Sequence, residues 1–128
     1  MSRLSAFLSL PSAVCCLLAA TASADTVFIA SFTTGGLYRY DTIDPVGTLT
    51  TLSGSGSMTK AATVALGPDG NLYIGEDGDG YSIAPAIRKY DLGSNVLSTV
   101  ITFPAFNLFP ASIAFKEGDM LVGRNPFF

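Results

Sequence analysis

The sequence has few of the residues that most enzymes use for catalysis. It contains no histidine, and its two cysteines, Cys15 and Cys16, both lie near the amino terminus. Histidine is the commonest general base, and the cysteine thiolate is a strong nucleophile. The chain after residue 24 therefore has neither a histidine base nor a cysteine nucleophile. A disulfide is excluded from the same stretch.

Charged residues are also scarce, at 13% of the chain. After residue 24 there are six basic residues, the chain's seven less Arg3, against ten acidic ones, which gives a net charge of −4. A mildly acidic chain without a basic stripe is a poor partner for nucleic acid or for an anionic membrane. We therefore expect neither of these partners.

The first 24 residues are typical of a cleavable signal peptide. Arg3 gives a positive start, residues 4–20 are mainly apolar, and two small residues, Ala22 and Ala24, follow. Small residues at these places fit the signal peptidase, so cleavage is expected after Ala24. The alternative, a retained membrane anchor, is disfavoured because Pro11 interrupts a segment that is barely long enough to span. The rest of the chain is therefore expected to be secreted, to the outside or to a periplasm.

That remaining part contains an internal repeat with a period of about 45–50 residues. One apolar segment occurs three times, as Val27–Ser31, Leu72–Glu76 and Met120–Arg124, and a second occurs twice, as Leu37–Asp41 and Ile87–Asp91. Two further segments recur in the same order, at Val64–Leu66 with Ile113–Phe115 and at Thr48–Leu52 with Leu97–Ile101. Ordered recurrence of four segments at one period is hard to obtain by chance.

A repeat of this length with four short strands is the pattern of a β-propeller blade. With strands lettered a to d from the axis outward, the chain reads b-c-d, a-b-c-d, a-b. The segments are short and rich in β-branched residues, so no helix is expected after the signal peptide. We therefore predict an all-β fold over residues 25–128, a partial β-propeller of about two four-stranded antiparallel blades, with repeats at 27–70 and 71–119 and a third beginning at residue 120.

Local chemistry supports this order of strands. Residues 67–70 read Gly-Pro-Asp-Gly, in which proline fixes the first turn position and the last glycine can adopt the positive φ that reverses the chain. The following segment is apolar on both faces, with Leu72 and Ile74 on one and Tyr73 and Gly75 on the other. A strand packed between two neighbouring blades has this character, because neither of its faces meets water.

The pattern resembles the propeller superfamily that includes NHL-repeat, gluconolactonase-like and streptogramin lyase-like proteins. The residues that carry the resemblance run from Val64 to Glu76, reading VALGPDGNLYIGE, and over Ile87–Asp91, reading IRKYD. The resemblance covers nearly all of residues 25–128 and implies six blades. Because two blades do not close a ring, we expect either missing blades of a longer propeller, of which this chain is the N-terminal part, or self-association.

The resemblance also implies a candidate activity. Gluconolactonase-like enzymes hold a central metal with Glu, Asn and Asp side chains, and Glu76 is the only tentative counterpart in this chain. A streptogramin lyase-like activity needs a histidine base, which the sequence lacks. Two functions are therefore considered: a non-catalytic binding or scaffold module for a protein or glycan ligand, and a metal-dependent lactonase whose catalytic residues lie mostly outside this chain.

The loop after the central strand holds the candidate metal ligands. Glu76, Asp77 and Asp79 are interspersed with glycines and offer oxygen atoms to calcium, although the full EF-hand pattern is absent. The alternative is a solvated acidic turn. Arg124 takes the place of Glu76 in the next repeat and is the candidate for a ligand-binding face, its alternative being an ion pair between blades.

The aromatic residues are assigned mainly to packing. Tyrosines in the predicted strands are expected in the core rather than on a carbohydrate-stacking platform: Tyr38, Tyr40, Tyr73 and Tyr90. Phenylalanines in a proline-broken segment are expected to pack under a loop that joins blades: Phe103, Phe106 and Phe109.

Overall fold

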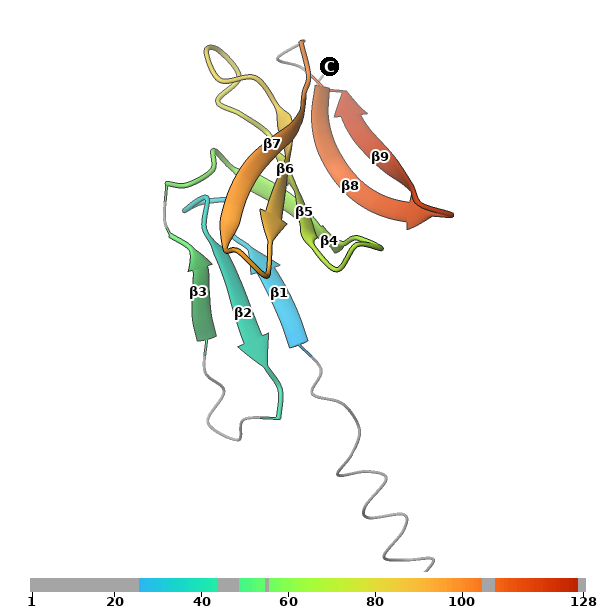
Figure 1. Ribbon diagram of the computed structural model, residues 1–128. Coiled ribbons are helices and arrows are strands. Elements are labelled where there is room, and N and C mark those ends of the chain that lie inside the picture. Colours follow the sequence, from blue (N-terminus) through green and yellow to red (C-terminus); the bar gives the residue numbers. More distant parts are fainter. Residues whose placement is uncertain (1–25, 44–48, 55, 105–107, 127–128) are drawn as a thin grey trace, which may run out of the picture.

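The computed structural model describes residues 26–43, 49–54, 56–104 and 108–126 (Figure 1). This part of the chain is all-β and contains no helix, so none of it forms the long apolar helix that a membrane span requires. The predicted all-β class is confirmed. The expected signal peptide, residues 1–24, lies outside the described residues.

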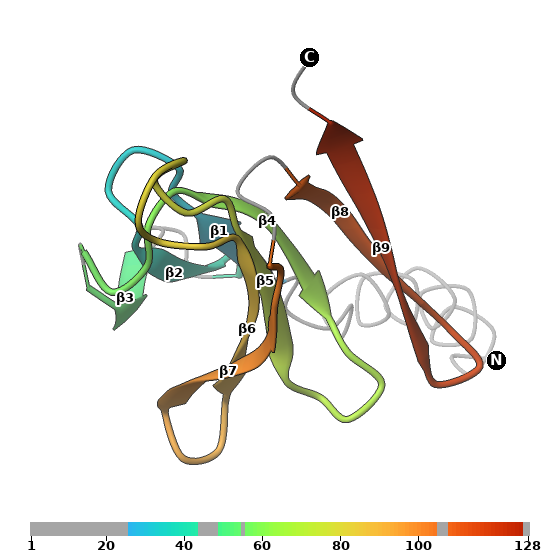
Figure 2. The same cartoon turned by 90° about the horizontal axis from the view of Figure 1, so that it is seen from above.

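The described residues form nine strands in three antiparallel sheets that follow one another along the chain (Figures 1 and 2). The first sheet holds β1 (Thr26–Ala30), β2 (Leu37–Asp41) and β3 (Leu49–Ser53). The second holds β4 (Ala61–Leu66), β5 (Leu72–Glu76), β6 (Ala86–Asp91) and β7 (Val96–Thr102). The third holds β8 (Leu108–Lys116) and β9 (Asp119–Pro126).

Each strand pairs with the next one in the chain, so every sheet is a simple meander. Sheets of three, four and two strands match the predicted order b-c-d, a-b-c-d, a-b. The three sheets lie next to one another with the β4–β7 sheet in the middle, and within the described residues they do not close on themselves (Figure 2).

The largest difference from the predicted strands is at the start of β8. The sequence places Phe109 and Pro110 in a loop, and this is wrong, because β8 already begins at Leu108. A proline has no N–H to give to a ladder, but the register of β8 on β9 shifts between Pro110 and Ser112, and such a bulge tolerates it. Of the other two phenylalanines in that segment, Phe103 donates its backbone N–H to the Pro85 carbonyl at 2.8 Å, and Phe106 lies outside the described residues.

The main hydrophobic core lies between the first and second sheets. Leu37 from β2 and Leu72 and Ile74 from β5 are completely buried there, and Phe28 and Ala30 from β1 pack against them. Burying side chains of this size contributes about 1.5–3 kcal/mol each. These contacts are therefore the principal link between the two sheets.

Tyr90 of β6 ties the same two sheets together with a polar contact. Its ring is 2% exposed within the core, and its hydroxyl donates to the backbone carbonyl of Leu52 in β3 at 3.0 Å. The hydroxyl also lies 3.1 Å from the Asn95 side-chain oxygen. Since a buried hydroxyl needs a partner, this geometry lets a large aromatic ring occupy the core without an unsatisfied polar atom.

A second interface joins the other side of the middle sheet to β8. Tyr73 of β5 meets Phe115 of β8 edge to face, with the ring centroids 5.1 Å apart. A Cβ atom on Gly75 would lie 2.8 Å from the Pro110 carbonyl oxygen and 2.6 Å from the Thr63 methyl group. Glycine at position 75 therefore allows the backbone of β8 to approach the middle sheet closely.

The two interfaces follow one packing rule. Phe28 and Ala30, which point from the first sheet to the second, are the repeat equivalents of Tyr73 and Gly75, which point from the second sheet to the third. We call this side of each sheet its forward face and the opposite side, which carries Ile74 in the middle sheet, its backward face. Each interface packs a forward face on the backward face of the next sheet.

Candidate functional site

Three connections lie at one end of the sheets and form what we call the loop face (Figures 1 and 2). They are the β1–β2 loop (residues 31–36), the β3–β4 connection (residues 54–60, of which 55 is outside the described residues) and the β5–β6 loop (residues 77–85). The predicted metal ligands and the beginning of β4 belong to this end. The loop face is therefore the candidate functional site.

Backbone hydrogen bonds join the three connections. The Gly56 N–H donates to the Thr34 carbonyl at 2.7 Å, and the Met58 N–H donates to the Gly35 carbonyl at 3.2 Å. On the other side of the β3–β4 connection, the Asp77 N–H donates to the Lys60 carbonyl at 3.1 Å. Since each connection is bonded to the next, the loop face is a single ordered surface rather than three separate loops.

Asp79 organises the β5–β6 loop from within. Its Oδ1 accepts the backbone N–H groups of Tyr81, Ser82 and Ile83 at 2.7–2.8 Å, and its Oδ2 accepts the Ser82 hydroxyl at 2.5 Å. These donors, led by the Ser82 hydroxyl, hold the pKa of Asp79 well below its usual value. The carboxylate therefore acts as a local cap that fixes the loop.

Apolar side chains project from this ordered surface. Tyr81 is 89% exposed at the tip of the β5–β6 loop, and Ile83, two residues further along the chain, is 45% exposed. Phe32, on the β1–β2 loop, is 51% exposed. Sequence reasoning missed these three residues because it searched the loops for charged groups and considered aromatic stacking only for tyrosines in strands. A tyrosine directly after a Gly-Asp-Gly run was a usable signal.

Glu76 is buried rather than presented to solvent. It is 4% exposed at the end of β5, where its Oε1 accepts the Thr59 N–H at 2.5 Å and its Oε2 lies 3.4 Å from the Arg88 guanidinium. Both carboxylate oxygens therefore have protein partners. The contact joins the β3–β4 connection to β5 and β6.

Asp77 is the one predicted ligand with an unpaired oxygen. Its Oδ1 is buried and has no hydrogen-bond partner among the described residues. Desolvation raises the pKa of Asp77, and the charge of Lys60 offsets part of that rise. A carboxylate held in this way costs folding stability, and such groups are candidates for functional sites.

The three predicted calcium ligands do not converge on a common point. Glu76 faces Thr59 and Arg88, and Asp79 is turned into its own loop. Within the described ranges, no group of three or more His, Cys, Asp or Glu side chains is arranged to hold a metal ion. Calcium binding by this loop stays a prediction.

Arg124, the candidate for a ligand-binding face, is exposed on β9 and stands opposite Pro110 in the ladder. It forms no ion pair with any residue that the structure describes. The side chain at the equivalent place in the middle sheet, Glu76, is buried instead. The two equivalent positions therefore differ in environment as well as in charge.

A paired substitution tests the opposite roles of Asp77 and Asp79. At pH 7 we expect Asp77→Asn to raise the free energy of unfolding, because it removes a partly desolvated charge. The gain should be less than about 1 kcal/mol, because water still screens part of that charge. Because the pKa of Asp77 is raised in the folded state, its ionised form lowers the stability of the parent chain, and this loss develops as the pH rises above the ordinary value of 3.8. The gain should therefore be larger at pH 7 than at pH 3.5 in urea titrations.

Asp79→Asn should give the opposite sign. A lowered pKa means that the stabilisation by this carboxylate is complete above the ordinary value of 3.8 and is lost as the pH falls below it. The variant should therefore be less stable than the parent at pH 7, and the gap should close at low pH. Equal effects of the two substitutions at both pH values would contradict this assignment.

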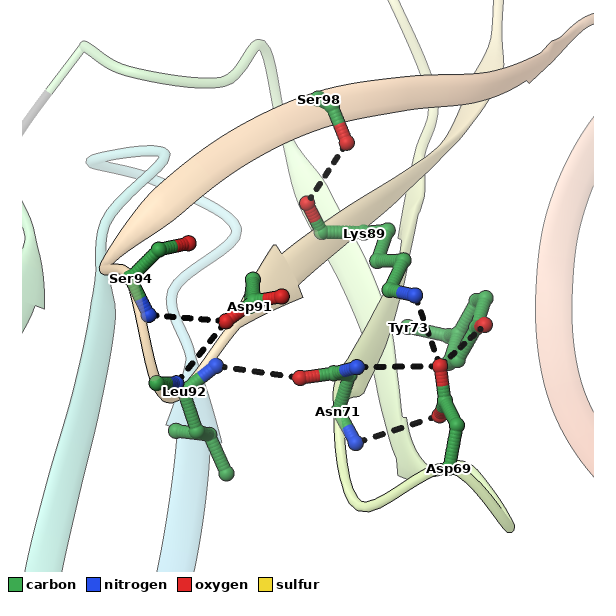
Figure 3. A network of polar contacts seen from close by, with 9 residues as sticks. Asp69, Asn71, Tyr73, Lys89, Asp91, Leu92, Ser94 and Ser98 are labelled. Atoms are coloured by element: carbon green, nitrogen blue, oxygen red, sulfur yellow. Dashed lines mark hydrogen bonds and ion pairs between the residues drawn. The ribbon is translucent and has the colours of Figure 1, made fainter.

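The far end of the middle sheet carries a polar network built on the Gly-Pro-Asp-Gly-Asn turn between β4 and β5 (Figure 3). Asp69 accepts the Lys89 ammonium at 2.7 Å, the Tyr73 hydroxyl at 3.1 Å and the Asn71 amide at 3.0 Å. The Asn71 side-chain oxygen in turn accepts the Leu92 N–H at 3.2 Å. The network thus links the β4–β5 turn to the β6–β7 turn.

These residues stabilise the end of the sheet through contacts with one another. The Lys89 ion pair, followed by the Asn71 amide, holds the pKa of Asp69 well below its usual value. The same ammonium lies 5.7 Å from the centroid of the Tyr73 ring. The segment that carries the resemblance to propeller families is therefore occupied with turn and strand packing.

The predicted packing role of the tyrosines is met most fully by Tyr90, which is buried, and by Tyr73, which contacts Phe115. Tyr38 and Tyr40 are partly exposed on the backward face of the first sheet.

Comparison of the chain with protein-family models, curated proteins and solved structures gives no match. The functional argument therefore depends on the geometry of the loop face.

Proposed function

We propose that this chain is an exported binding module of the β-propeller type that holds a ligand on its loop face. Three meanders in the same strand order, stacked forward face on backward face, support the propeller interpretation, because blades around an axis pack in this way. The export proposal rests on the signal-like pattern of residues 1–24.

The observation that carries the binding function is the presentation of Tyr81. Its ring is 89% exposed, yet the loop below it is fixed by the four hydrogen bonds to Asp79. A rigid aromatic side chain offers a large contact area at a low cost in conformational entropy. An exposed ring on an ordered loop is thus suited to recognition.

A glycan is the ligand class that this arrangement favours. The C–H face of a sugar ring packs on a flat aromatic ring, and the surrounding hydroxyls need polar partners. Ser82 adjoins Tyr81, and Lys60 and Asp77 belong to the same loop face. A protein ligand is the second candidate, favoured by the exposed Phe32 and Ile83.

The test is binding of the chain to a panel of immobilised oligosaccharides that covers neutral, amino and acidic sugars. We expect at least one class to bind, and Tyr81→Ala to weaken that binding by about tenfold or more, or about 1.4 kcal/mol. Tyr81→Phe should retain most of it, because the ring remains. Leu66→Ala, at the opposite end of the sheet and 58% exposed, is the matched control.

Two results would argue against this function. If no sugar class binds, the glycan proposal fails, and Phe32 becomes the residue to test with protein ligands. If a sugar binds equally to the parent and to Tyr81→Ala, the ligand site lies elsewhere on the molecule.

The metal-dependent lactonase remains the alternative prediction, and the geometry favours it less. Its tentative metal ligand, Glu76, is 4% exposed and forms an ion pair with Arg88. A cation bound by this carboxylate would have to displace the guanidinium. Hydrolysis of simple lactones in the presence of calcium, lost in Glu76→Gln, would support the alternative.

A further inference from the structure

The two outer faces of the three-sheet stack have no partner among the described residues, and the outer face of the first sheet is apolar. On the backward face of the first sheet, Val27 is 44% exposed, Ile29 42% and Leu49 57%. The ladder places Val27 opposite Tyr40 and Ile29 opposite Tyr38. These five side chains therefore form one contiguous patch, which we call the backward patch.

The backward patch is the repeat equivalent of a surface that is buried elsewhere in the same molecule. Val27 and Ile29 correspond to Leu72 and Ile74 in the middle sheet, and both of the latter are completely buried against the first sheet. Large exposed apolar patches are rare on monomers and mark interaction sites, so we expect the backward patch to be covered by a partner.

The forward face of the third sheet offers the complementary surface. Leu121 of β9 is 53% exposed. It is the repeat equivalent of Tyr73 in the middle sheet, which packs against Phe115 of the third sheet. Leu121 stands opposite Ala114, and Gly123, the equivalent of Gly75, stands opposite Ser112. We call the surface formed by these four residues the forward patch.

The forward patch has the same arrangement as the packed forward face of the middle sheet, with small residues beside one large side chain, Leu121. In the middle sheet, Gly75 admits the backbone of the neighbouring sheet, and Tyr73 supplies the large side chain beside it. Both internal interfaces pack a forward face on a backward face. Within the described residues, one backward face, on the first sheet, and one forward face, on the third, are left uncovered.

We propose that the backward patch of one chain binds the forward patch of a second copy, which continues the internal packing rule between molecules. The contact is head to tail, so each chain uses a different surface from its partner's. Such heterologous contacts add chains in one direction until the ring closes or the assembly extends. This proposal rests on the packing of the sheets and is independent of the loop face.

The test is the mass of the chain, produced from its full sequence, by light scattering over a concentration series. The parent should show multiples of the single-chain mass that increase with concentration. Ile29→Lys, in the backward patch, and Leu121→Lys, in the forward patch, should each shift to the single-chain mass. A lysine at either place puts an unpaired charge in the contact.

A mixture of the two variants separates this proposal from its competitors. Ile29→Lys keeps an intact forward patch and Leu121→Lys keeps an intact backward patch, so a 1:1 mixture should form a dimer that does not grow. Val96→Lys, 54% exposed on β7 and outside both patches, should behave like the parent. Far-UV circular dichroism establishes that each variant is folded, and serine replaces lysine if one is not.

Three results would overturn the proposal. A parent chain that keeps the single-chain mass up to its highest soluble concentration has no such contact. Continued self-association of either lysine variant alone would show that like patches pair with like. A mixture that stays at the single-chain mass would show that the two patches do not bind each other.

Discussion

Tyr90→Ala should destabilise the protein by about 3–5 kcal/mol, the range for removing a large buried aromatic side chain. Tyr90 is 2% exposed in the core between the first two sheets, so its removal leaves a cavity there and a Leu52 carbonyl without its hydrogen bond. A loss of this size is a large part of the 5–15 kcal/mol typical of a folded domain. Urea titration followed by circular dichroism measures it.

Tyr90→Phe separates the ring from the hydroxyl. It keeps the packing but removes the donor to the Leu52 carbonyl, so the expected loss is about 1–2 kcal/mol. Tyr81→Ala is the control, because an 89% exposed ring contributes little to folding and its loss should change stability by less than about 0.5 kcal/mol. If Tyr90→Ala costs no more than this control, the first two sheets are not held together through this residue.

Gly75→Val should destabilise the second interface by about 1–3 kcal/mol or more, as is usual for overpacking a filled site. Valine suits a strand, so its intrinsic preference opposes the loss. The cost arises because the added Cβ would lie 2.8 Å from the Pro110 carbonyl oxygen, a backbone atom that cannot rotate away. The free energy of unfolding in urea is again the measurement.

Gly54→Val is the matched control for this substitution. A Cβ on Gly54 meets nothing within 4 Å and the residue has no positive φ, so the change should stay within about 0.5 kcal/mol. Equal effects at the two glycines would mean that the third sheet does not press on the middle sheet at Gly75.

The strands were predictable because their signal is local. Leu37–Asp41 and Leu72–Glu76 have the bounds read from the sequence, since each is a short apolar or alternating run between turn residues. The start of β8 was not predictable in this way. Pro110 reads as a strand breaker, and only the bulge opposite Arg124 in the ladder makes it acceptable within a strand.

The chemistry of the loop face was less accessible to sequence reasoning. Glu76 looks like an exposed ligand beside other acidic residues, but its partners are Thr59, which is 17 residues away, and Arg88 on the next strand. Asp79 was predicted as a calcium ligand, and in the structure its carboxylate accepts hydrogen bonds from its own loop. Burial and long-range pairing decide the role of a carboxylate, and neither is encoded in local spacing.

The packing rule of the three sheets has a consequence for how such a protein can change over time. Each outer sheet makes its main contacts with the middle one, so the folding energy is close to a sum of unit and neighbour contributions. Duplicating or deleting one whole meander leaves every remaining junction of the same type. The architecture can therefore gain or lose length by recombination without redesign of its interior.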